Sequence, residues 1–141
     1  MDYEKVTAQQ FGHSLRAISV NLLVRDLLAE AAFLTGVFGM ATHRASRDFA
    51  IMTHAGQAFQ LHADHTYGAH PLLGLLPESG PRGAGVEIRL HEADPDAAVA
   101  RLADFPAGTL LQPASDKPGH GLREAVILCP NGYAWVPSRR I

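Results

Sequence analysis

Three side chains that carry charge or a proton alternate along one short stretch of this sequence. In GVEIRLHEADPDAAVARL, Glu87, Arg89 and His91 are separated by single apolar residues. A period of two predicts a strand, so the three polar groups share one face. There Arg89 can bind an anion and Glu87 or His91 can accept a proton. The alternative is that Arg89 pairs with Glu87 or a neighbouring acid and only stabilises the sheet. Either way, the pattern predicts a polar cavity against this strand.

Histidines form a second candidate site. His62, His65 and His70 lie within LHADHTYGAH, and neutral imidazole is a common ligand of zinc, iron or copper. Their spacing matches no compact chelating turn, which favours separate rings that are hydrogen-bonded or solvated. Gln60 precedes His62 by two residues, so a regular strand turns both side chains into the same cavity.

The residues after the Glu87 strand predict the helix on which it packs. Asp94 can cap the free N–H groups of a helix, and Pro95 fits the first helical position. Val99, Leu102 and Phe105 supply the apolar face of this helix. The strand therefore lays its apolar face on the helix and turns its polar face to the cavity.

The same order of elements occurs earlier in the chain. Ser19 to Asp26, SVNLLVRD, is followed by LLAEAAFLTGVFG, and it superposes on the later stretch without a gap. Ser19 then falls on Glu87, and Asn21 falls on Arg89. An internal repeat of strand, acidic cap and helix predicts two related modules.

Turn signals divide the rest of the chain. Residues 1–15 form an N-terminal extension, a short helix packed either on the outside or across a dimer partner. The remainder, 16–141, is predicted to be a single domain made of module one (16–63), a glycine- and proline-rich linker (64–84) and module two (85–137). Short strands are expected at Met40–Arg44, Phe49–His54, Gln57–Ala63, Thr109–Pro113, Leu122–Leu128 and Tyr133–Val136.

Three segments carry a family resemblance. VNLLVRDLLAEAAFLTGVFGM and GVEIRLHEADPDAAVARL, with CPNGYAWV near the end, resemble the vicinal-oxygen-chelate superfamily. This superfamily includes glyoxalase I, extradiol dioxygenases, fosfomycin-resistance enzymes and bleomycin-resistance proteins. The resemblance implies an α+β fold of two βαβββ modules whose curled mixed sheets surround a central cleft, usually in a homodimer. It also implies that the loop with His120 borders the cleft.

The resemblance also implies where a divalent metal would bind. Metal-using members take His or Gln from the first strand of each module and Glu or a comparable donor from the last. The corresponding positions here are Ser19, Glu87, Gln60 and Val136, and the last is decisive because valine has no donor atom. We therefore expect the usual metal site to be degenerate and no cofactor. A divalent metal held by Gln60, His62 or Glu87 is the alternative.

The expected function follows from these residues. We predict a glyoxalase/bleomycin-resistance-like protein that binds a small anionic or polar molecule in its cleft. Whether it is an enzyme stays open: the alternative is a lyase, isomerase or dioxygenase with a non-standard metal site or metal-free acid–base chemistry. The predicted ligand cavity comprises Ser19, Asn21, Gln60, His62, Glu87, Arg89, His91, His120 and Val136.

Composition excludes several other classes. The chain has a net charge of −2 and no internal basic run, which argues against a nucleic-acid surface. Cys129 is the single cysteine, so no intrachain disulfide can form. The N-terminus lacks a signal-peptide pattern, and the richest apolar region, 18–41, is interrupted by charges, which predicts a cytoplasmic protein without a membrane span. The apolar linker stretch PLLGLL needs cover, and we expect a homodimer.

Overall fold

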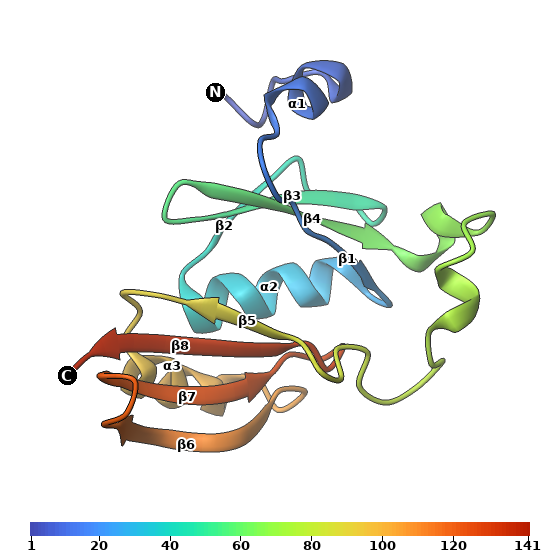
Figure 1. Ribbon diagram of the computed structural model, residues 1–141. Coiled ribbons are helices and arrows are strands. Elements are labelled where there is room, and N and C mark those ends of the chain that lie inside the picture. Colours follow the sequence, from blue (N-terminus) through green and yellow to red (C-terminus); the bar gives the residue numbers. More distant parts are fainter.

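The chain folds into two βαβββ modules, each with a four-stranded mixed sheet, in a computed structural model that describes all 141 residues (Figure 1). Module one contains β1 (Asn21–Val24), α2 (Leu27–Phe38), β2 (Ala41–His43), β3 (Phe49–His54) and β4 (Gln57–Ala63). Module two contains β5 (Glu87–Leu90), α3 (Pro95–Arg101), β6 (Thr109–Lys117), β7 (Leu122–Leu128) and β8 (Ala134–Arg140). Helix α1 (Ala8–Ser14) precedes both modules, and short 3-10 turns occur at Asp64–Tyr67, Leu73–Leu75 and Leu102–Asp104. The predicted α+β class and module order are confirmed.

The two sheets repeat one topology. In module one the strand order is β1-β4-β3-β2, and in module two it is β5-β8-β7-β6. The first strand of each module pairs in parallel with the last, so β1 and β5 are edge strands. The aligned acids cap the two helices as predicted: Asp26 accepts from Ala29 N in α2, and Asp94 accepts from Asp96 N in α3.

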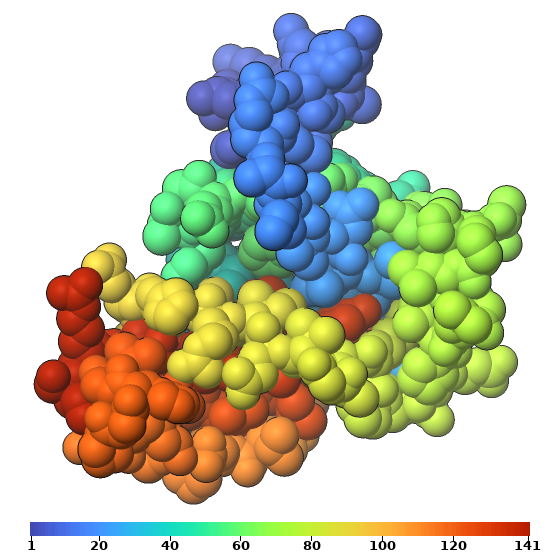
Figure 2. Space-filling view, viewed as in Figure 1, coloured from blue at the N-terminus to red at the C-terminus, as the bar shows by residue number.

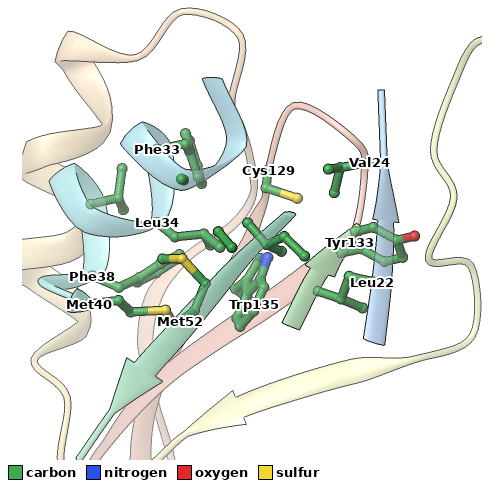
Figure 3. Packing of buried hydrophobic residues seen from close by; sticks show 14 of the residues in the cluster. Leu22, Val24, Phe33, Leu34, Phe38, Met40, Met52, Cys129, Tyr133 and Trp135 are labelled. Carbon is green, nitrogen blue, oxygen red and sulfur yellow. The ribbon is translucent and has the colours of Figure 1, made fainter. Parts of the chain in front are cut away.

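One hydrophobic core joins the modules. From module one, α2 contributes Phe33 and Leu34, and β3 contributes Met52. From module two, β8 contributes Trp135 (Figure 3). Phe38 and Trp135 meet with ring centroids 5.9 Å apart. Trp135 is 1% exposed, and Tyr133, two residues earlier, also packs in this core. The shared core fixes one module against the other.

Helix α1 covers the opposite face of the module-one sheet. Val6 and Phe11 pack against Ile51 in β3, and the three form a small separate core. Because successive strand residues point to opposite faces, Ala50 and Met52 face α2 while Ile51 faces α1. Figure 1 shows α1 and α2 on opposite sides of this sheet. The N-terminal extension therefore packs on its own module.

The chain between α1 and β1 differs from the sequence prediction. A regular strand beginning at Ile18 would turn Ile18 and Val20 to the core face together with Leu22, but they are 90% and 41% exposed. Regular pairing of β1 with β4 begins only at Asn21, opposite Gln60. Since α1 is held on the far face of the sheet, residues 16–20 cross its edge as an exposed strap before β1 starts.

Candidate ligand-binding cleft between the modules

A cleft of about 350 Å³ lies where the two modules meet, within the size range of small-molecule sites. Figure 2 shows the surface hollowed between the β3–β4 hairpin and β5. Two larger hollows are more open to solvent: one lies within the N-terminal extension, and the other lies at the start of α2, and neither contains a residue of module two. The cleft is lined by residues of both modules: Ile18, Ser19, Val20, His54, Ala55, Gln57, Ala58, Phe59, Ile88, Arg89, Leu90, His91, Glu92 and Trp135.

The walls of the cleft are mainly apolar, since eight of its fourteen lining residues are hydrophobic. Phe59 and Trp135 meet with ring centroids 5.6 Å apart, so the edge of the shared core forms the cleft floor. The strap contributes Ile18 and Val20, whose exposed side chains are explained by this position. The cleft can therefore enclose a compact apolar group.

Polar groups reach the cleft from both modules. His54, at the end of β3, belongs to module one, and His91 and Glu92 follow β5 in module two. Glu92 adopts a φ of 55°, and this left-handed turn ends the strand at the cleft. Two imidazoles and a carboxylate are thus available to accept or donate hydrogen bonds to a bound molecule.

Arg89 lines the cleft but is already paired with two carboxylates. Its Nη1 donates to Glu87 Oε2 over 3.2 Å, and its Nη2 donates to the carboxylate of Glu124 in β7. Glu124 has a side chain only 8% exposed, whereas that of Glu87 is 55% exposed. The hydrogen bond that Arg89 donates to Glu124, together with the negative charge of that carboxylate, raises the pKa of Arg89. Arg89 thus pairs with Glu87 and with a neighbouring acid, as the alternative predicts, and it also borders the cleft.

Four other predicted residues lie outside the cleft: three belong to a polar cluster on module one, and the fourth is isolated in a turn. They are Asn21, Gln60, His62 and His120. His62 Nε2 lies 3.1 Å from Gln60 Oε1, and Asn21 Nδ2 donates to Tyr67 Oη over 3.4 Å. The Tyr67 ring lies beside the imidazole of His62, with centroids 5.2 Å apart. Partial burial lowers the pKa of His62 and favours its neutral form. None of these residues lines the cleft, nor does His120, which is exposed in the β6–β7 turn.

Of the nine residues predicted for the cavity, the structure brings Ser19, Arg89 and His91 to the cleft. Glu87 points to the same strand face as Arg89 but outside the cleft lining, and Val136 is fully buried opposite Arg89. The sequence analysis missed His54, Gln57, Phe59 and Glu92 because they sit at strand ends and in the β3–β4 hairpin. The Ala55-Gly56 turn predicts a tight hairpin between these strands, and in the structure its tip lines the cleft with residues of β5.

The residues at the implied metal positions do not fit a divalent ion. Val136 offers no donor atom, Gln60 is hydrogen-bonded to His62, and Glu87 is paired with Arg89. No three His, Cys, Asp or Glu side chains gather where they could hold an ion.

The histidine-rich segment also lacks a shared centre. His62 lies against Gln60, His65 Nε2 lies 2.6 Å from Asp48 Oδ1, and His70 Nδ1 accepts from Leu72 N over 3.0 Å. Each ring therefore has a partner of its own.

Comparison with known proteins gives the fold. No family model matches the sequence, and no curated protein sequence is similar to it. Among solved structures, a glyoxalase/bleomycin resistance protein/dioxygenase family enzyme from Burkholderia phytofirmans PsJN superposes with a TM-score of 0.71. That match has 20% identity and covers 87% of this chain and 97% of the other.

Two further solved structures have the same fold. A glyoxalase-related enzyme from Fulvimarina pelagi has a TM-score of 0.68 at 19% identity, covering 89% of this chain and 88% of the other. A glyoxalase/bleomycin resistance protein/dioxygenase from Nocardioides has a TM-score of 0.65 at 21% identity, covering 94% and 89%. The chain has the fold of these glyoxalase/bleomycin-resistance structures, which is the fold that the resemblance to the vicinal-oxygen-chelate superfamily implies. Its longest α-helix, α2, has 12 residues, and none could span a membrane.

Proposed function

We propose that this protein is a metal-free binding module that holds a small molecule in the cleft between its two modules. The observation that carries the proposal is the cleft itself, an apolar pocket of about 350 Å³ with a few polar groups at its rim. Such pockets are the usual form of a small-molecule site. An apolar body would lie against Phe59, Ile88 and Trp135, with its polar end toward His54, His91 or Glu92.

The donor chemistry supports a binding role without a metal. The four positions that the superfamily resemblance assigns to ligands hold Ser19, Gln60, Glu87 and Val136, which supply one strong ligand among them. That ligand, Glu87, is engaged by Arg89. Several structures with this fold carry bleomycin resistance in their names, which is consistent with a binding module.

A neutral fluorescent probe tests the proposal. N-phenyl-1-naphthylamine is apolar and uncharged, and we expect its emission to rise on binding in the cleft. Ser19→Phe should fill the strap side of the cleft and weaken probe binding at least tenfold, which is about 1.4 kcal/mol. Ser79→Phe is the matched control because Ser79 is an exposed linker serine outside the cleft. Equal affinity in both variants, or no binding to the native protein, would refute the site.

A second candidate function rests on the pair of imidazoles. His54 and His91 come from different modules, and with Glu92 they offer acid and base groups at one cleft. This arrangement favours a metal-free lyase or isomerase over a dioxygenase, which requires oxygen activation. In that case His54→Gln would abolish turnover of a substrate, although the folded variant would still bind the naphthylamine probe.

A further inference from the structure

We infer that the cleft takes a compact apolar amine in preference to a carboxylate of the same shape. The inference rests on the proposed binding function and names the charge of the ligand that this site selects. It departs from the anionic ligand suggested by the sequence, in which Arg89 was the natural anion receptor.

Arg89 is poorly suited to hold an anion. Its two terminal nitrogens each donate to a carboxylate, one on Glu87 and one on Glu124. The group of three carries a net charge of −1, so a ligand carboxylate approaching the guanidinium would meet two acids beside it. Like charges repel, and because Glu124 is buried, water screens that repulsion only weakly.

Glu92 supplies the opposite feature, a carboxylate without a counter-ion. Glu92 lies in the lining of the cleft, is exposed, and takes part in no salt bridge or side-chain hydrogen bond. The adjoining hollow that it shares with His54 also contains Arg101 and Asp94, whose charges offset each other. Arg101 donates to Val37 O over 3.1 Å and forms no ion pair. Glu92 is therefore the free charge at the cleft.

The two ends of the cleft together define the ligand. Phe59, Ile88 and Trp135 provide a wall for an apolar, preferably aromatic, body. Glu92 can accept a charge-assisted hydrogen bond from an ammonium group, a bond about twice as strong as a neutral one. A compact aryl amine satisfies both the wall and the carboxylate, whereas an aryl carboxylate satisfies only the wall.

An isosteric series tests the charge preference. 1-Naphthylmethylamine, 1-naphthalenemethanol and 1-naphthoate share one ring system and carry a cationic, neutral or anionic head at pH 7. Titration calorimetry at low salt should show the amine binding about tenfold tighter than the alcohol, with the naphthoate weakest. Trp135, the single tryptophan, reports whether each probe enters the cleft through a change in its fluorescence.

Two variants of equal charge separate the cleft from the general field of the protein. Glu92→Gln should reduce amine affinity to that of the alcohol, whereas Glu78→Gln, an exposed linker position outside the cleft, should leave it unchanged. If naphthoate binds tightest, or if Glu92→Gln keeps the amine preference, the charge inference is overturned while the cleft remains a binding site. If none of the three probes changes Trp135 fluorescence or releases heat, the proposed function falls as well.

Discussion

Asn131, in the turn between β7 and β8, donates a hydrogen bond from Nδ2 to the carboxyl Oε2 of Glu30 in α2 over 2.7 Å. Asn131 also accepts, through Oδ1, from the backbone N–H of Arg25, so one side chain of module two binds module one twice. Glu30 is fully buried and its Oε1 has no partner. Burial raises its pKa, and burial followed by the charge of Glu30 raises the pKa of the Cys129 thiol to about 12.

Glu30 should make stability depend on pH. A carboxyl whose folded pKa is raised stabilises the fold fully below its unfolded value of about 4.5. That contribution is lost as pH rises through the raised pKa, because the folded state then holds a buried charge. The advantage of Glu30→Gln over the native protein should therefore grow with pH in urea unfolding between pH 5 and 8. Glu78→Gln, an exposed control, should show no such trend. A constant difference between Glu30→Gln and the native protein would contradict the prediction.

Two arginines that each bridge two acids should differ sharply in their effect on folding. Arg89→Ala leaves the nearly buried Glu124 without a partner and should cost about 2–3 kcal/mol. Arg123 pairs with Asp96 and Asp116, both at least half exposed, so Arg123→Ala should cost much less. Chemical denaturation measures both variants. The double change of Arg89 and Glu124 to leucine should recover most of the loss, and equal losses in the two single variants would show that burial of Glu124 does not matter.

The module architecture was predictable because the same local sequence pattern of strand, acidic cap and helix occurs in both modules. Asp26 and Asp94 align in the repeat, and each caps a helix as a short polar side chain before an apolar run should. These features depend on neighbours within a few residues, and for that reason the sequence alone specified them.

The cleft was only partly predictable because it depends on tertiary register. Glu124 meets Arg89 across two strand pairings, from β5 to β8 and from β8 to β7, which no local pattern reveals. Exposure of Ile18 follows from the anchoring of α1 on β3, a contact between segments about 40 residues apart. The sequence therefore located the right strand, but not the residues of module one that face it.

The linker should mediate dimer formation. Leu75 is 81% exposed and Leu72 is 40% exposed, and together they form an apolar surface on the linker that the single chain leaves open. We expect a homodimer by light scattering at micromolar concentration, and Leu75→Asp should convert it to a monomer. Leu28→Asp, at an exposed site on α2, is the control and should remain dimeric. A native protein that is already monomeric would remove this expectation.

Helix α1 should act as a stabilising cover for module one, with Phe11 as its anchor. The Phe11 ring is 5% exposed and lies edge-on to Tyr3, with centroids 5.9 Å apart, while Ile51 beneath it is 1% exposed. Phe11→Ala should lower the free energy of unfolding by about 3 kcal/mol, because it removes a buried aromatic ring and uncovers Ile51.

Gln9→Ala is the matched control, since Gln9 is exposed on the same helix and alanine favours helix formation. If Phe11→Ala proves no more destabilising than Gln9→Ala, α1 does not hold the sheet.

The Phe11→Ala change should also weaken ligand binding in the cleft. Residues 16–20 connect α1 to β1, and Ile18, Ser19 and Val20 form one wall of it. Release of α1 should therefore weaken binding of N-phenyl-1-naphthylamine under conditions in which the Phe11→Ala variant is still folded.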